Sequence, residues 1–186
     1  MKRKALAVVL FAVSGLLIGP ARAADGQITI TGLITDTTCP ISGSTSATPG
    51  TSPDFPVALK HVQASALKAI GDTASYTPVF IHIGGGANCT APSVAVLFER
   101  SSPMINPATG NLLISAAGSP ATNVEVQLVD VTANAAIDLR LAASSSPVPL
   151  VSGVVTSLPF AAQYVATGAA GPGTVDTSVQ YSVTFP

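Results

Sequence analysis

Charged side chains are scarce in this sequence: only 9% of its 186 residues are Asp, Glu, Lys or Arg, against about 25% in an average soluble domain. Eight Lys and Arg residues are too few to neutralise a phosphate backbone, which excludes a nucleic-acid-binding protein. Glu, Lys, Arg and Leu do not recur at heptad spacing, which excludes a coiled coil or helical bundle. Tryptophan is absent and aromatic residues make up 5%, which argues against an aromatic-rich ligand-binding face.

The composition favours one folded domain instead. Hydrophobic residues make up 47% of the chain, and with so little charge they exclude disorder driven by self-repulsion. The length suits a single domain, or a domain with a tail. Glycine and proline, at 16 and 15 residues, gather in clusters with Ser, Thr and Asn, as expected for turns between short elements.

The first 23 residues have the pattern of a secretory signal peptide. Lys2, Arg3 and Lys4 precede an apolar run at residues 5–18, and residues 21–23 read Ala-Arg-Ala, a small-x-small cleavage site. The run is shorter than the ~20 residues needed to cross a bilayer, so a membrane anchor is disfavoured. Cleavage after Ala23 leaves four basic residues against nine acidic ones, a formal charge of −5.

The mature chain has two cysteines, Cys39 and Cys89. In an oxidising compartment such a pair favours a disulfide, which would close a loop of about 50 residues and contribute roughly 4 kcal/mol. A metal site is the disfavoured alternative, because His61 and His82 lie at no metal-motif spacing from either cysteine. We expect no metal and no cofactor.

Apolar and polar residues alternate with period two in five segments, which is typical of half-buried strands. Four of the segments are residues 28–34, 94–98, 124–128 and 160–166, and the fifth is the final segment, 175–185. Turn-rich stretches at 42–53, 147–149 and 168–173 separate them, and residues 62–68 predict at most one short helical turn. The fold class predicted is an all-β antiparallel sandwich.

Catalytic patterns are weak. Neither His61 nor His82 has an evident nucleophile and orienting partner for a triad. The glycines at 84–86 lack the lysine and following helix of a phosphate loop. The sequence therefore predicts no enzyme.

The two ends of the mature chain suggest how copies could associate. An alternating strand precedes Cys39, and the chain stops on an apolar strand with no turn and partner after it. A sandwich that lacks its closing strand leaves an open groove, and an N-terminal strand from another copy could fill it. Such a head-to-tail contact does not close on itself and builds a fibre. On pattern alone, the N-terminal strand could equally be the first strand of a self-contained sandwich.

Three segments resemble chaperone–usher pilins, the major subunits of type 1-like fimbriae. DGQITITGLITDTTC resembles their N-terminal extension, LKAIGDTASYTPVFIHI their segment leading into the second strand, and FAAQYVATG with VQYSVTFP their last two strands. The resemblance implies an incomplete immunoglobulin-like sandwich that lacks its final strand and is completed by donor-strand exchange. It also implies three segments: a signal peptide at 1–23, a donor extension at 24–38 and a pilin domain at 39–186.

The resemblance also assigns residues and partners. The inserted donor residues would be Ile28, Ile30, Gly32 and Ile34, with Gly32 at the family's glycine, where the groove is shallow. The acceptor groove would be lined by Val175, Val179, Tyr181, Val183 and Phe185, and Cys39 and Cys89 would form the family disulfide that joins the first two strands. Phe185 stands where many members have tyrosine. Implied partners are other copies of the chain, a periplasmic chaperone, an outer-membrane usher, and tip adhesin or adaptor subunits, with the fimbria on the bacterial surface supporting cell adhesion.

Other functions remain as alternatives. A minor adaptor pilin would share these features, whereas a tip adhesin would carry an additional N-terminal lectin domain. A secreted, self-complete β-sandwich that binds a ligand such as a sugar is the alternative from a different class. An exported enzyme is disfavoured because no site is evident.

Overall fold

The computed structural model describes residues 39–142 and 144–186. The predicted signal peptide and the predicted donor residues Ile28, Ile30, Gly32 and Ile34 lie outside this range. The elements are β1 (Ile41–Ser44), the 3₁₀ turn η1 (Ala64–Ala66), β2 (Thr73–Gly84), β3 (Ser93–Phe98), β4 (Thr122–Asp130), β5 (Ala135–Ala136), β6 (Val148–Pro149), β7 (Val155–Gly171) and β8 (Tyr181–Thr184). None of the described helices is long and apolar enough to cross a membrane.

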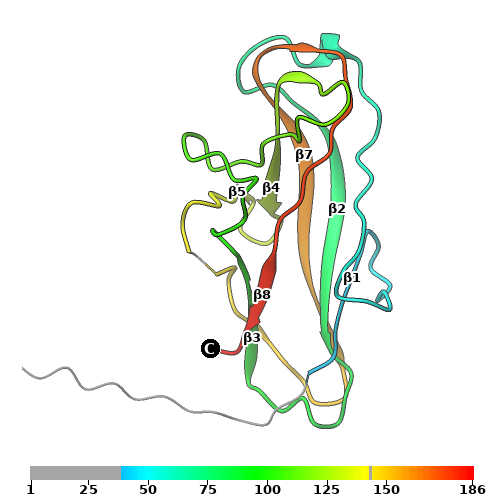
Figure 1. Ribbon diagram of the computed structural model, residues 1–186. Helices are drawn as coiled ribbons and strands as arrows, with labels where there is room; N and C mark the ends of the chain where they lie inside the picture. The colour runs from blue at the N-terminus through cyan, green and yellow to red at the C-terminus, as the bar shows by residue number, and fades with distance from the viewer. Residues whose placement is uncertain (1–38, 143) are drawn as a thin grey trace, which may run out of the picture. The chain divides into compact units, whose positions relative to one another are not determined.

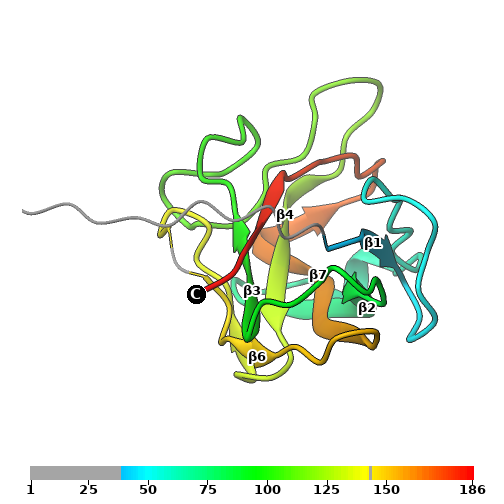
Figure 2. The ribbon, with the colours of Figure 1, turned by 90° about the horizontal axis from the view of Figure 1, so that it is seen from below.

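Two antiparallel sheets form the domain. The larger has the strand order β1-β2-β7-β4-β5, and the smaller has the order β6-β3-β8. Figure 1 shows the long strands β2 and β7 side by side, with β3 and β8 together to the left of them. Figure 2 looks at the same strands from below. The prediction of an all-β sandwich is confirmed.

The core lies between the two sheets and follows the predicted alternation. In β3, Val94 and Val96 are fully buried, and Phe98 packs edge-to-face on Phe160 of β7, with ring centroids 5.3 Å apart. Burial of each such side chain contributes about 1.5–3 kcal/mol. The buried cluster comprises Val79, Ile81, Ile83, Val94, Val96, Phe98, Leu112, Val126, Leu128, Leu139, Leu158, Phe160 and Ala162.

Strands occupy parts of all three stretches that the sequence assigned to turns. β1 extends to Ser44, β6 includes Val148 and Pro149, and β7 continues to Gly171. These residues pair through their backbones with β2, β3 and β4, respectively, and that pairing needs no alternation of side chains. The short helical turn expected within 62–68 is confirmed as η1.

The last strand is shorter than predicted. Alternation extends over 175–185, but β8 comprises only Tyr181–Thr184, because its partner β3 ends at Phe98 opposite Tyr181. The residues before Tyr181 continue without a strand partner.

Candidate functional site: the groove beside β8

β8 is an edge strand whose free side faces a groove. Among the described strands it pairs with β3 alone. The Glu99 N–H donates to the Gln180 carbonyl at 2.8 Å, so Gln180 turns its backbone groups toward the β3 side. In an antiparallel pair the N–H and C=O groups of successive residues point to opposite sides of the strand. The N–H and C=O groups of Tyr181 and Val183 therefore point toward the free side of β8. An additional strand could therefore bind here through its backbone.

The groove has a volume of about 1430 Å³ and is bounded by two walls. One wall is the segment 174–183, which includes most of β8, and the other is the segment 53–59 that follows β1. Core residues of both sheets form the floor, among them Val79, Ile81, Leu128 and Phe160. The floor is buried, but the apolar side chains of both walls are only partly buried, which favours association with another apolar segment.

The wall at 53–59 is held in place by its contact with β1. The Gly43 N–H donates to the Ser52 carbonyl at 2.9 Å, and the Phe55 ring lies in the space that a Cβ on Gly43 would need. Phe55, Val57 and Leu59 alternate inward and pack against the core. Their period-two spacing could have predicted this wall, but the predicted turn-rich stretch ends at Pro53, and no element was predicted for residues 54–59.

The opposite wall contains four of the five residues predicted for it. Val175, Val179, Tyr181 and Val183 line the groove and pack, partly buried, against the core. Phe185 lies outside this lining and is 41% exposed.

Thr177, which sequence reasoning did not single out, also lines the groove. Its hydroxyl oxygen is buried and has no hydrogen-bond partner among the described residues. A buried polar atom of this kind costs about 1–3 kcal/mol unless another group satisfies it.

Tyr181 connects the two walls. Its hydroxyl donates to the Pro53 carbonyl at 2.8 Å, so the side chain extends from β8 to the opposite wall. Burial, and to a lesser extent the negative charge of Asp54, raises the pKa of the Tyr181 hydroxyl. The phenol is therefore neutral at physiological pH and keeps this donor.

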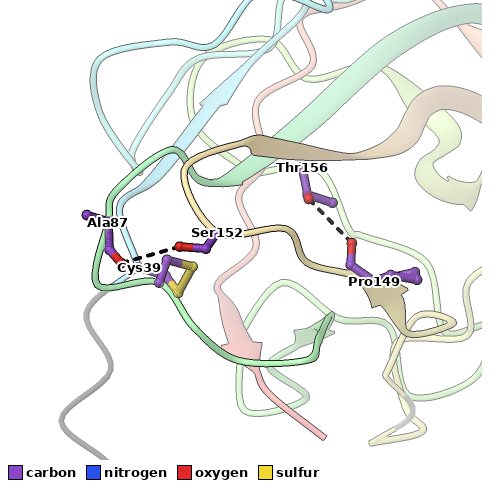
Figure 3. Close-up of a disulfide and its surroundings, with 6 residues drawn as sticks. Cys39, Ala87, Pro149, Ser152 and Thr156 are labelled. Atoms are coloured by element: carbon purple, nitrogen blue, oxygen red, sulfur yellow. Dashed lines mark hydrogen bonds between the residues drawn. A yellow bond between two sulfur atoms is a disulfide. The ribbon is translucent and has the colours of Figure 1, made fainter.

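The predicted disulfide is present. Cys39 and Cys89 are bonded, with Cα atoms 4.6 Å apart. Cys39 precedes β1 and Cys89 follows β2, so the bond joins the adjoining ends of the first two strands. Figure 3 shows the bond beside Ala87 and Ser152, whose hydroxyl donates to the Ala87 carbonyl at 3.4 Å. The bond therefore ties the start of the described chain to the segment that follows β2.

The two histidines have different surroundings. His61 is exposed beside the groove, whereas His82 is only 2% exposed. His82 Nδ1 lies 2.7 Å from the Ser157 hydroxyl and Nε2 lies 3.0 Å from the Ser44 hydroxyl, so the ring connects β1, β2 and β7. Burial lowers the pKa of His82. The described residues contain no cluster of three or more His, Cys, Asp or Glu that could hold a metal ion.

Known proteins resemble this chain in sequence and in fold. Residues 28–186 match a family model described as fimbrial protein. The chain is 37% identical over 171 residues to the major fimbrial subunit SMF-1 of Stenotrophomonas maltophilia, with 89% of this chain and 95% of that protein covered. It is 33% identical over 186 residues to the type-1 fimbrial protein, A chain, of Escherichia coli, with both chains fully covered. A solved chaperone–usher pilus structure shares its fold, with a TM-score of 0.58 at 18% identity over 88% of this chain and 96% of that one.

Proposed function

The chain belongs to the fimbrial protein family and is a structural subunit of a pilus, and we propose that it polymerises by donor-strand exchange. The observation that carries this proposal is the groove along the unpaired side of β8, whose apolar wall residues lie half-buried over the core. A strand from a neighbouring copy would cover that core and satisfy the free backbone groups of Tyr181 and Val183.

The donor is the N-terminal extension of the next subunit, residues 24–38. Ile28, Ile30 and Ile34 alternate with polar residues, so all three side chains can enter the groove together. Burial of each contributes about 1.5–3 kcal/mol before the cost of ordering the extension. Gly32 shares this inward face. Each subunit gives its extension to one neighbour and receives one from another, and this heterologous contact builds a filament.

This function requires export. Residues 1–23 act as the signal peptide, and residues 39–186 fold as the pilin domain after the Cys39–Cys89 disulfide forms in the oxidising periplasm. A periplasmic chaperone covers the groove until an outer-membrane usher adds the subunit to the filament. Adaptor and tip adhesin subunits complete the fimbria on the cell surface, which supports adhesion.

Deletion of residues 24–36 tests this proposal. The truncated chain should still accumulate with its chaperone, because the pilin domain and its groove are intact. It should extend no filament, because it has no strand to insert into a neighbour. Electron microscopy of surface filaments and gels of unheated samples would measure assembly.

Two matched sets of substitutions keep the extension at its full length, so they separate the loss of its side chains from the loss of its length. Ile28→Ala, Ile30→Ala and Ile34→Ala together should reduce filament yield at least tenfold, because they remove the buried side chains. Thr29→Ala, Thr31→Ala and Thr35→Ala together alter the other face of the strand and should leave the yield within about twofold. Normal filaments from the truncated chain would show that the extension is not the donor.

A further inference from the structure

We propose that consecutive subunits also touch end to end, through a second contact outside the groove. One side of the contact is a turn with three exposed valines at residues 151–155 (the valine turn), and the other side is Ile70 of the next copy. This inference rests on the filament-forming function proposed above and adds a domain-to-domain contact to it. The contact uses neither the groove nor the N-terminal extension.

The valine turn presents three neighbouring apolar side chains to solvent. Val151, Val154 and Val155 are 60%, 52% and 40% exposed. The Val154 N–H donates to the Val151 carbonyl at 3.0 Å, and Gly153, at the third position of this turn, has the positive φ of 76° that a type II turn requires there. Exposed turns favour Gly, Pro, Asn, Asp and Ser. Adjacent exposed valines on such a turn therefore indicate an interaction surface.

The segment after β2 holds the valine turn in place. The Gly85 N–H donates to the Val154 carbonyl at 3.1 Å, and the Ser152 hydroxyl donates to the Ala87 carbonyl at 3.4 Å (Figure 3). A Cβ on Gly85 would lie 2.8 Å from a methyl group of Val155, so the Val155 side chain packs close to the Gly85 backbone. Because the turn is already ordered, docking on it costs little conformational entropy.

The end of the domain that carries the valine turn has no formal charge. Residues 39–44, 84–93 and 147–157 meet at this end, where the Gly84 N–H donates to the Pro40 carbonyl at 3.0 Å and the Leu150 N–H donates to the Pro92 carbonyl at 3.1 Å. None of these residues is Asp, Glu, Lys or Arg. Such a surface suits an apolar partner and offers nothing to a strongly charged one.

The opposite end of the same strands presents Ile70. β2 pairs with β7 from Thr73 opposite Val165 to Gly84 opposite Val155. At about 3.3 Å per residue, the ends of this ladder lie roughly 35 Å apart. In Figure 1 the segment before β2 lies at the top and the start of β7 at the bottom. Ile70, just before β2, is 80% exposed, the largest fraction of any large hydrophobic residue that the structure describes.

The turn that carries Ile70 is also fixed to the domain. The Asp72 carboxylate accepts hydrogen bonds from the N–H groups of Lys68 at 2.9 Å and Ala69 at 2.8 Å. The Ala166 N–H of β7 donates to the Asp72 carbonyl at 2.9 Å. Because the backbone on both sides of Ile70 is bonded in this way, its side chain stays in solvent until another surface covers it.

A second copy is the partner that fits both ends. The chain is a structural subunit of a pilus, so copies of it follow one another along the filament. Only residues 35–38 separate the proposed donor residues from Cys39, and four residues span at most about 14 Å. The copy that receives the extension therefore lies close to the valine turn.

The two ends also match the open symmetry of a filament. The valine turn and Ile70 are different surfaces at opposite ends of the β2–β7 ladder, so a contact between them is heterologous and repeats from copy to copy without closing. A contact between two valine turns would instead be isologous and would stop at two copies. The geometry therefore favours Ile70 as the surface that covers the valines.

Cross-linking in assembled filaments tests the contact directly. Ile70→Cys is combined in the full chain with Val151→Cys, Val154→Cys or Val155→Cys, and the filaments are mildly oxidised after assembly. At least one combination should give a ladder of cross-linked subunits on denaturing gels, which reductant should abolish. Leu141→Cys with Val154→Cys is the matched control, because Leu141 is as exposed as Val151 but lies in the loop between β5 and β6, and it should give no ladder. An equal ladder from the control would overturn the contact.

Introduced charges test whether the contact stiffens the filament. Val154→Asp with Ile70→Asp places like charges at every junction, whereas Val154→Asp with Ile70→Lys places opposite charges there. Both residues are exposed, so both variants should fold and be exported. In electron micrographs at low salt, the like-charge filaments should have a persistence length at least twofold shorter than the opposite-charge filaments. Salt at about 1 M should remove most of this difference, because it screens the charges. Equal persistence lengths at low salt would contradict the contact.

The outcomes separate this inference from the function on which it rests. Filaments that form at wild-type yield but give no ladder with any of the three cysteine pairs would overturn the end-to-end contact and keep the donor strand. Loss of export with Val154→Asp, whichever residue stands at position 70, would assign the valine turn to the export machinery and overturn the contact. Deletion of residues 24–36 tests the donor strand alone, because it leaves the valine turn and Ile70 intact.

Discussion

Tyr181 combines a large ring with a polar end, and both matter in the groove. The ring contributes buried apolar area, and the hydroxyl donates to Pro53, which precedes it by 128 residues. The alternation in the last segment predicts that Tyr181 faces inward. It cannot predict the bond to Pro53, because that depends on how the segment after β1 folds back.

Glu125 shows the limit of period-two patterns at a single residue. The alternation predicts that Glu125 lies on the polar face of the strand, opposite to the face of Val124 and Val126. Its side chain is nevertheless only 4% exposed. Its carboxylate accepts hydrogen bonds from Thr109 Oγ1 at 2.7 Å and from Asn111 Nδ2 at 3.0 Å, which bind the loop between β3 and β4 to the sheet. Alternation distinguishes two faces of a strand, but not whether a loop covers the second face.

His82 predicts a pH dependence of stability. Burial lowers the pKa of His82 in the folded domain below the usual value near 6.5. As the pH falls through that value, the unfolded chain therefore binds more protons than the folded domain does. The neutral, buried His82 therefore makes its full contribution to the free energy of unfolding above about pH 6.5. That contribution is lost as the pH falls toward the pKa of His82 in the folded domain. His82→Gln cannot be protonated and should lose less of its free energy of unfolding between pH 7.5 and 5.

Urea denaturation at the two pH values measures this effect. His61→Gln is the matched control, because it removes the exposed histidine, and its pH dependence should follow that of the wild type. An equal loss of stability in wild type and His82→Gln would show that His82 does not carry the pH dependence.

At the scale of elements, alternation predicts parts of β3, β4, β7 and β8. It was not used to predict β2, which only the family resemblance indicated, although Val79, Ile81 and Ile83 alternate along its buried face. β3, β4 and β7 follow the alternation of Val94, Val126 and Phe160 with their neighbours. β6 has two residues and β1 has four, including a glycine, so neither can show a pattern. In the wall at 53–59 apolar and polar residues alternate, but the segment has no partner strand and contains two prolines, which are not typical of a paired strand.

The contact between β1 and this wall gives a prediction for groove shape. Gly43→Val should displace the Phe55 ring, because a Cβ at position 43 lies within the space of that ring. The wall would move, and filament yield should fall at least tenfold while the exported subunit still accumulates. Combining Gly43→Val with Phe55→Ala frees the space and should recover part of the yield.

Gly71→Val is a glycine control at a position with open space around it, although its positive φ of 90° adds local strain. It lies in the turn before β2, so any loss of stability should leave the groove intact. A larger loss of filaments with Gly71→Val than with Gly43→Val would contradict the role given to the wall.

At the scale of the whole molecule, the low charge and the open groove have one explanation. With four basic and nine acidic residues after removal of the predicted signal peptide, the subunit would offer few charges to oppose contact with its own copies. In the proposed donor-strand exchange each subunit would give its extension to one neighbour and receive one from another, so identical head-to-tail contacts would repeat along the filament.

The structure of the assembled filament, determined by electron cryomicroscopy, tests the central claim most directly. Donor-strand exchange predicts one additional strand in each groove, beside β8, that continues into Cys39 of the adjacent subunit. A groove that is empty, or filled by the subunit's own residues 24–38, would contradict it.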